Sequence, residues 1–262
     1  MTNAPEIQFN DGAAYEQLMG RWSSLVGMRF LDWCAVPKRL AWLDVGCGNG
    51  AFTEEILRAA SPRDVTGIDP SPGQIAYAKA RPGCEGAAFQ IGDAQALPFA
   101  AESFDVATMA LVISFVPDPL QAVREMKRVT KSGGTVATYM WDLPGGGVPL
   151  APFYRVLKSL GEPAPMPPQA EMSTLPALEN LWRQAGLIGV ETTTIRIPVT
   201  FANFDEFWET NTLPVGPHAE RIRTLSEDMR ATLKQKLKAS LPAASDGSIT
   251  YEAFANAVKG RV

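Results

Sequence analysis

Residues 43–50, LDVGCGNG, decide the fold: an apolar strand runs directly into a glycine loop, and a helix begins near Ala51. Glycine lets the backbone approach a ligand closely, and amide groups at the start of the helix point toward that ligand. The G-x-G-x-G spacing differs from the G-x-G-x-x-G of dinucleotide-binding loops, and Asp44 precedes it. A carboxylate there would repel a pyrophosphate but could help to hold an ammonium group. A tight strand-to-helix turn without a ligand explains the loop alone equally well.

Two more aspartates follow the next two predicted strands. Asp69 ends the strand Val65–Asp69, where a carboxylate can accept hydrogen bonds from both hydroxyls of a ribose. Asp93 follows the third strand, where it could accept from an adenine amino group. Each aspartate alone is more often a helix cap or a turn residue. Together with Asp44, however, they stand at the carboxyl ends of successive strands, where open α/β sheets bind ligands.

Strands and helices alternate through the first half of the chain. The predicted strands are Arg39–Val45, Asp64–Ile68, Phe89–Ile91, Phe104–Ala110 and Thr135–Trp141. The predicted helices between them are Ala51–Ala60, Pro72–Ala80 and Pro119–Val129, the last closed by the turn Ser132–Gly134. Residues 12–36 add one or two amphipathic N-terminal helices. This alternation predicts a parallel sheet between two layers of helices.

After Trp141 the alternation is interrupted by two segments, 142–173 and 202–247, which we interpret as insertions that cap the sheet. Between them the pattern predicts a helix at 174–185 and a strand at 190–199, and within the second insertion helices at 204–210 and 218–241. Residues 249–258 fit an edge strand or a helix, and topology favours the strand. We therefore expect one domain over 1–262, a doubly wound, seven-stranded, mainly parallel α/β sheet. The Pro- and Gly-rich stretch 143–168 is expected to bury little surface and to open as a lid.

The motifs resemble those of the class I S-adenosylmethionine-dependent methyltransferases, which have a Rossmann-like fold. LDVGCGNG is similar to their first motif, GIDPS (67–71) to their ribose-binding motif and GDAQALPF (92–99) to their adenine-site motif. FDVATMALVISFVPDP (104–119) and REMKRVTKSGG (124–134) are similar to their fourth strand, the next helix and the turn before the fifth strand. The opening Tyr15-Glu16 with MGRWS (19–23) resembles a lead-in near the ubiquinone and menaquinone C-methyltransferases.

This resemblance implies S-adenosylmethionine as the cofactor and assigns a binding residue to each part of it. The methionine portion would contact Gly46, Gly48 and Gly50, with Asp44 nearby and Tyr15 and Arg21 closing on its carboxylate; the ribose would contact Asp69 and Pro70; the adenine would contact Asp93 and Ala94; and the backbone of Ala110 and Leu111 would meet the amino-acid end. For Arg21, a solvated charge on a helix is nearly as good an interpretation.

The catalytic residues are not evident from the sequence. Relatives often have His-His where this chain has Ser114-Phe115, and its one histidine, His218, lies in the second insertion. No metal-binding constellation is recognisable. Methyl transfer needs little more than alignment of the acceptor with an activated donor in a dry pocket. Aromatic residues that could line this pocket, or could equally pack the cap against the core, are Phe115, Trp141, Phe153, Tyr154 and Trp208; Asp142 is the first candidate for a carboxylate that orients the acceptor.

The composition limits the kinds of molecule that the chain is expected to bind. The net charge is −4 and the basic residues are scattered, so we expect no nucleic-acid partner. The N-terminus has no recognisable signal segment, and no apolar run is long enough to span a membrane. The three cysteines form neither an even set nor a close metal-type pair, which is typical of free thiols in a reducing compartment. Together these features predict a cytoplasmic protein. The expected reaction is methyl transfer to carbon, oxygen or nitrogen of a small molecule. A non-catalytic cofactor-binding regulator and, less in keeping with the loop, a nicotinamide-dependent oxidoreductase are the alternatives; the acceptor and the oligomeric state stay open.

Overall fold

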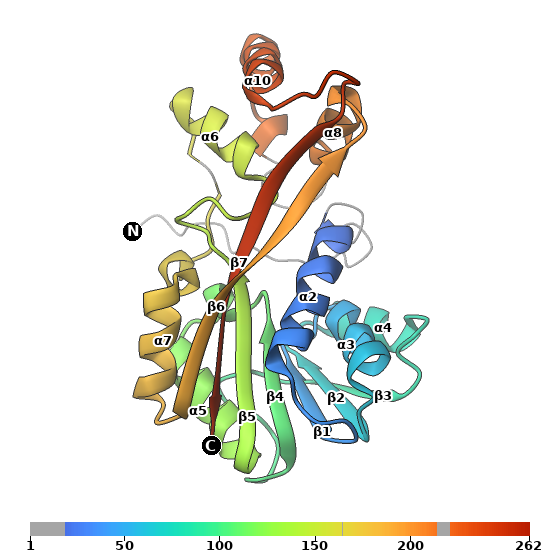
Figure 1. Cartoon of the computed structure of the whole chain (residues 1–262), viewed down its shortest axis with the longest axis vertical. Coiled ribbons are helices and arrows are strands. Elements are labelled where there is room, and N and C mark those ends of the chain that lie inside the picture. Colours follow the sequence, from blue (N-terminus) through green and yellow to red (C-terminus); the bar gives the residue numbers. More distant parts are fainter. Residues whose placement is uncertain (1–18, 164, 214–220) are drawn as a thin grey trace.

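The structure, a computed structural model, describes residues 19–163, 165–213 and 221–262. Within these residues one seven-stranded sheet has the order β3-β2-β1-β4-β5-β7-β6 (Figure 1). The strands are β1 Ala41–Val45, β2 Asp64–Asp69, β3 Ala87–Ile91, β4 Phe104–Ala110, β5 Thr130–Trp141, β6 Ile188–Phe201 and β7 Ile249–Arg261. Pairing is parallel from β3 to β5, whereas β7 runs antiparallel to β5 and β6. The predicted α/β fold is confirmed, and the strand interpretation of the closing segment is right.

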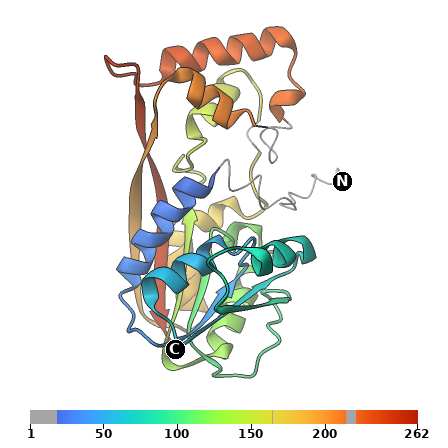
Figure 2. The ribbon, with the colours of Figure 1, turned by 90° about the vertical axis from the view of Figure 1, so that its right-hand side faces the viewer.

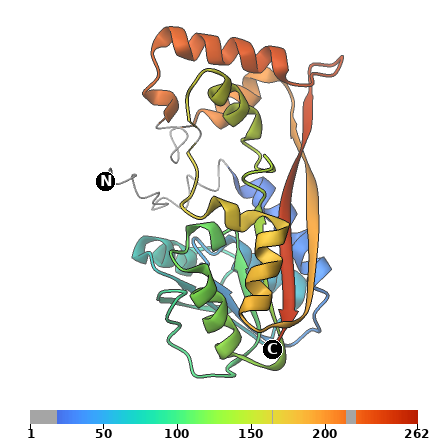
Figure 3. The same ribbon diagram turned by 90° about the vertical axis from the view of Figure 1, so that its left-hand side faces the viewer.

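Helices cover both faces of this sheet. All the helices, including those of the cap described below, are α2 Arg21–Cys34, α3 Ala51–Glu55, the π-helix η2 Ile56–Ala60, α4 Pro72–Ala80, the 3-10 helix η3 Ile113–Phe115, α5 Pro119–Val129, α6 Ala151–Ser159, the 3-10 helix η4 Ala170–Ser173, α7 Leu175–Gln184, α8 Phe204–Asn211 and α10 Glu227–Ser240 among the described residues. Helices α2, α3 and α4 lie on one face, and α5 and α7 lie on the other (Figures 1 and 3). None of the helices among the described residues is long and apolar enough to cross a membrane.

Two boundaries differ from the prediction for local reasons. Ser132–Gly134 does not close α5 but lies inside β5, which starts at Thr130 and shifts register against β4. The helix expected at 218–241 is found as α10, which begins at Glu227 because the Ser226 hydroxyl accepts a hydrogen bond from the Met229 amide at 3.2 Å. Residues 214–220, with His218, lie outside the described residues.

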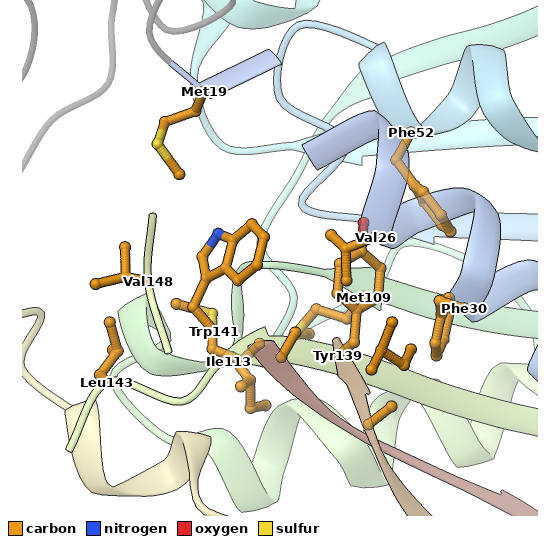
Figure 4. Close-up of a cluster of buried hydrophobic side chains, with 14 of the residues drawn as sticks. Met19, Val26, Phe30, Phe52, Met109, Ile113, Tyr139, Trp141, Leu143 and Val148 are labelled. Atoms are coloured by element: carbon orange, nitrogen blue, oxygen red, sulfur yellow. The ribbon is translucent and has the colours of Figure 1, made fainter. Parts of the chain in front are cut away.

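An aromatic cluster fixes α2 and α3 against the sheet. The ring of Tyr139, in β5, lies 4.6 Å from that of Phe30 in α2 and 5.6 Å from that of Phe52 in α3, centre to centre (Figure 4). All three are buried. Burying such a side chain contributes about 1.5–3 kcal/mol, so the cluster holds the start of α2 at the carboxyl edge of the sheet.

Strands β6 and β7 continue beyond the end of β5 as a two-stranded arm. Trp141, the last residue of β5, pairs with Ala255, whereas β7 already begins at Ile249, opposite Phe201. Alternate residues of β6 are buried on one face of this arm: Ile195, Ile197, Val199 and Phe201. The arm carries α8 and α10 above the carboxyl edge of the sheet, and α6 lies beside them (Figures 1 and 2).

The cap formed by α6, α8 and α10 has its own aromatic core. The ring of Phe153, in α6, stacks 5.3 Å from that of Phe207 and 5.9 Å from that of Trp208, both in α8. Phe153 and Phe207 are fully buried there. The prediction that Phe153 and Trp208 line the acceptor pocket is therefore wrong, because both side chains are used to pack the cap helices together.

The expectation that residues 143–168 bury little surface is also wrong. Val148, Leu150 and Leu157 are buried along with Phe153, and α6 forms within this stretch. Gly147 is buried as well. It packs so closely that a Cβ atom there would lie 2.2 Å from the carbonyl oxygen of Phe254. Residues 148–157 of this segment are therefore packed into the cap, whereas Gly145 and Gly146 are exposed, and the opening of the segment as a lid stays a prediction.

A buried amide connects the two ends of the first insertion, 142–173, to the sheet. The Asn256 side chain, in β7, donates to the Asp142 carboxylate at 3.0 Å and to the Ser173 carbonyl at 2.9 Å, and it accepts from the Thr194 hydroxyl at 2.9 Å. The other Asp142 oxygen accepts from the Gly145 amide at 2.8 Å. Asp142 therefore closes a turn and holds Asn256, which corrects its prediction as an acceptor-orienting carboxylate.

We expect N256A to lower the free energy of unfolding by about 2–4 kcal/mol, because it removes the hydrogen bonds of the buried Ser173 carbonyl and of the half-buried Asp142 and Thr194. Urea denaturation measures this change. T250A is the control on the same arm, since the Thr200–Thr250 hydroxyl pair is exposed, and we expect it to cost less than about 0.5 kcal/mol. Equal effects of the two variants would show that the amide network does not hold the cap.

Candidate functional site

A cavity of about 890 Å³ opens between the carboxyl edge of the sheet and the cap. Its walls come from the glycine loop, the ends of β2, β4 and β5, the start of α2 and the cap segment that follows β5. Ligands of open α/β sheets bind at this edge. Of the predicted site residues, those that line the cavity are Arg21, Gly46, Gly48, Asp69, Pro70, Asp93, Ala94, Ala110, Leu111, Phe115, Trp141 and Tyr154.

Glycine is required at two positions of the loop for different reasons. Gly46 has φ +72°, and a Cβ atom there would lie 2.7 Å from two side-chain carbons of Val112. Gly48 has φ +51° and faces open space, so it leaves the cavity floor bare. Gly50 does not line the cavity, contrary to the prediction. It packs against Ala78 and Cys84, where a Cβ atom would lie 3.1–3.3 Å from each.

Asp69 ties the glycine loop to the end of β2. One carboxylate oxygen accepts from the Gly48 amide at 3.0 Å, and the other accepts from the Ser71 amide at 2.9 Å. Partial burial raises the pKa of Asp69, and the two amide bonds lower it. Each oxygen keeps a free lone pair, so Asp69 can hold the loop and still accept hydrogen bonds from a ligand in the cavity.

Asp44 lies beneath the loop, fully buried, and does not line the cavity. One of its carboxylate oxygens accepts from the Thr53 hydroxyl at 2.7 Å, while the other has no partner among the described residues. Burial raises the pKa of Asp44 to about 7, against the lowering effect of Thr53, and the charge of Asp69 adds a smaller increase. Asp44 is therefore not placed to contact the methionine portion of a cofactor directly. When the carboxyl is deprotonated, its charge can act through the loop.

The remaining predicted residues of the cofactor half lie around the cavity mouth. Asp93 is exposed, and its carboxylate accepts from the Gln95 amide at 2.9 Å. Leu111 has φ +61°, which is uncommon for a residue with a side chain, and its amide donates to the Tyr139 carbonyl at 2.9 Å. Such strained backbone is concentrated at functional sites, and here it turns the chain just after β4 at the cavity wall.

Arg21 lines the cavity from the start of α2 and connects α2 with the arm. Its guanidinium donates to the Thr200 carbonyl at 3.2 Å, forms an ion pair with Glu206 at 3.5 Å and lies 3.8 Å from the centre of the Trp22 ring. Arg21 is therefore not a purely solvated charge, and any ligand that it binds shares the guanidinium with these protein partners. Tyr15 lies outside the described residues.

The cap half of the cavity contains apolar residues that were not predicted. They are Met19, Met140, Leu143, Val148, Leu150, Pro165 and Pro167. Those within residues 143–168 could not be predicted, because the few aliphatic residues of this Pro- and Gly-rich stretch form no periodic pattern. No group of three or more His, Cys, Asp or Glu side chains in the described part of the chain is arranged to hold a metal ion.

A family described as a methyltransferase domain matches residues 43–138. The matched stretch runs from β1 into β5, so it contains the glycine loop, Asp69 and Asp93, whereas the cap helices and the arm lie outside it.

Two relatives with partial matches are also named as methyltransferases, and one solved structure shares the fold. The chain is 36% identical over 97 residues to 2-methyl-6-phytyl-1,4-hydroquinone methyltransferase 2 of Oryza sativa, covering 37% of this chain and 28% of that protein. It is 42% identical over 103 residues to demethylmenaquinone methyltransferase of Staphylococcus aureus, covering 38% and 43%. The chain thus matches less than half the length of either relative. A phosphoethanolamine N-methyltransferase 2 of Haemonchus contortus, solved with S-adenosylhomocysteine, shares the fold with TM-score 0.55 at 17% identity, covering 95% of this chain and 56% of that one.

The buried Asp44 carboxyl should make the cofactor-free protein less stable as the pH rises from 5 to 8. The folded chain holds this proton until about pH 7, whereas the unfolded chain releases it near pH 4, so folding binds a proton in between. We expect the stability of D44N relative to the wild type to rise by about 2–3 kcal/mol over this range. Urea denaturation at pH 5, 6, 7 and 8 measures it.

D64N, which removes a half-exposed carboxylate at the other end of the neighbouring strand β2, controls for loss of a surface charge. A stability difference between D44N and the wild type that stays constant with pH would contradict a protonated Asp44.

Proposed function

We propose that the chain is an S-adenosylmethionine-dependent methyltransferase that methylates a small, largely apolar molecule and releases S-adenosylhomocysteine. One observation supports this most directly. A single cavity joins a polar half, formed by the glycine loop and Asp69, to an apolar half beneath the cap. A charged cofactor and an apolar acceptor need these two environments side by side, and the fold provides both within about 890 Å³.

The residues of the polar half fit the proposed cofactor. Asp69 has free lone pairs for the ribose hydroxyls, and Gly48 leaves space that any Cβ atom would begin to fill. Asp93 and Ala94 would meet the adenine, and the backbone at Ala110 and Leu111 would meet the amino-acid end. When it is deprotonated, the Asp44 carboxyl beneath the loop favours a cationic ligand and disfavours a pyrophosphate. These features argue against a nicotinamide cofactor.

The chemistry asked of the protein is alignment and exclusion of water. The cofactor supplies an activated methyl group on a sulfonium, so this chain's residues need to orient the acceptor and keep the cavity dry. Both relatives reported above are named for hydroquinone or menaquinone precursors, and an uncharged ring of that kind suits walls made by Leu143, Val148 and Leu150. Which atom receives the methyl group is left to experiment.

Cofactor binding is the first test. Saturation with S-adenosylhomocysteine at roughly 100 times its Kd should stabilise the protein by about 2.7 kcal/mol, whereas NAD and NADP should not raise the Tm. D69N should weaken this binding about tenfold, because it removes a charge-assisted acceptor, while D64N at the other end of β2 should bind normally. Calorimetry measures both. Stabilisation by NAD with none by S-adenosylhomocysteine would contradict the proposal.

Turnover is the second test and separates an enzyme from a non-catalytic cofactor-binding protein. The protein is incubated with S-adenosylmethionine labelled in its methyl group and a metabolite extract of the source organism, and mass spectrometry follows the label. We expect one apolar product to acquire it, and D69N to slow its formation about tenfold at subsaturating cofactor. Tight cofactor binding with no labelled product from any extract fraction would favour the regulatory alternative.

A further inference from the structure

One buried hydrogen-bond donor in the cavity wall has no acceptor. Trp141 ends β5, is 3% exposed and lines the cavity, and its indole N–H lacks a partner within the described residues. An unpaired buried donor destabilises a protein, because it loses its hydrogen bond to water on folding. A phenylalanine would fill an apolar wall without that cost, so the N–H needs an explanation.

The parts of the cavity wall around this N–H that come from β5 and the cap segment are apolar. Figure 4 shows the indole nitrogen on the side of the ring that faces Met19 and Val148. The cavity residues contributed by the end of β5 and by the cap segment behind it are all uncharged: Met140, Trp141, Leu143, Val148, Leu150, Tyr154, Pro165 and Pro167. Burial raises the pKa of the Tyr154 hydroxyl, so this group also stays neutral. These two segments can therefore offer hydrogen bonds but neither a counter-ion nor a strong base.

Two other tryptophans show that the feature is specific to this place. Trp182 is equally buried, and its indole N–H donates to the Val136 carbonyl at 3.0 Å. Trp42 also lacks an acceptor, but it lies in β1, inside the core, and does not line the cavity. Of these three, Trp141 alone combines an unpaired N–H with a side chain that lines the cavity.

We propose that the indole N–H of Trp141 binds an uncharged oxygen of the methyl acceptor, a ketone, phenol or alcohol on an otherwise apolar framework, and so selects and orients it. This rests on the proposed function and narrows its substrate class. The missing acceptor of the N–H is then supplied by the substrate. Ammonium, carboxylate and phosphate compounds are disfavoured, because their charges would lose water beside uncharged walls, and the Arg21 guanidinium is already paired with Glu206 and the Thr200 carbonyl.

The test uses three small probes of nearly the same shape, added to the protein loaded with S-adenosylhomocysteine: 1-tetralone, naphthalene and 2-naphthoate. We expect 1-tetralone to bind about five- to tenfold more tightly than naphthalene, as one neutral hydrogen bond predicts, and 2-naphthoate to bind most weakly. In ¹H–¹⁵N spectra, 1-tetralone should move the Trp141 indole N–H signal downfield, and naphthalene should not. W141F identifies that signal by its loss.

W141F should remove the preference for 1-tetralone over naphthalene while leaving the affinity for S-adenosylhomocysteine unchanged. Incorporation of 3-benzothienylalanine at position 141 keeps the shape of the side chain and deletes only the N–H, so it provides the same comparison if W141F fails to fold. Equal weakening of both probes would mean that Trp141 only packs, and unchanged preference would mean that it does not bind the oxygen. Either result, or no binding of 1-tetralone at its solubility limit, overturns the proposal.

The proposed function fails separately from this inference. A protein that does not bind S-adenosylhomocysteine can still be titrated with the three probes alone, and the shift of the Trp141 signal then reports on the N–H without the cofactor. Conversely, methyl transfer to a charged product together with unchanged probe selectivity in W141F would leave the proposed function standing and remove the role of Trp141.

Discussion

The hydrogen bond from the Gly48 amide to the Asp69 carboxylate is the constraint on which the site depends. It joins the loop after β1 to the end of β2, and the loop can reach it only because Gly46 passes Val112 without a side chain. The same path leaves Gly48 facing the cavity and starts α3 in position. A residue other than glycine at 46 would push the loop away from β4, and the carboxylate would lose its amide partner.

The second half of the cavity is assembled in a different way. Segments far apart in the sequence meet there: the end of β5, the cap segment behind it and the start of α2. Asn256 holds the first two together from β7, and Arg21 connects α2 to the arm through Thr200 and Glu206. This half therefore depends on long-range polar contacts, whereas the cofactor half is formed by neighbouring parallel strands.

That difference explains what the sequence could and could not predict. The glycine loop, Asp69 and Asp93 follow consecutive strands, so their meeting at one edge could be predicted from the order of elements alone. The pattern could not say on which side of the loop Asp44 and Gly50 lie, and both are beneath it. Aromatic residues of the insertions could face either the cavity or the cap core; Tyr154 does the first and Phe153 the second, although they are adjacent.

Trp141 stands at the boundary of the two halves. It is the last residue of β5, just beyond residues 43–138, which match the methyltransferase domain family, and its ring lies against the cap segment that the match does not include. The sheet fixes its backbone by pairing with Ala255, so the indole is attached to a strand end and not to a loop. A donor held in this way gives the acceptor a fixed reference point relative to the cofactor loop. The sequence of the cap around it can then vary, and with it the shape of acceptor that the cavity admits, without disturbing the alignment that methyl transfer requires.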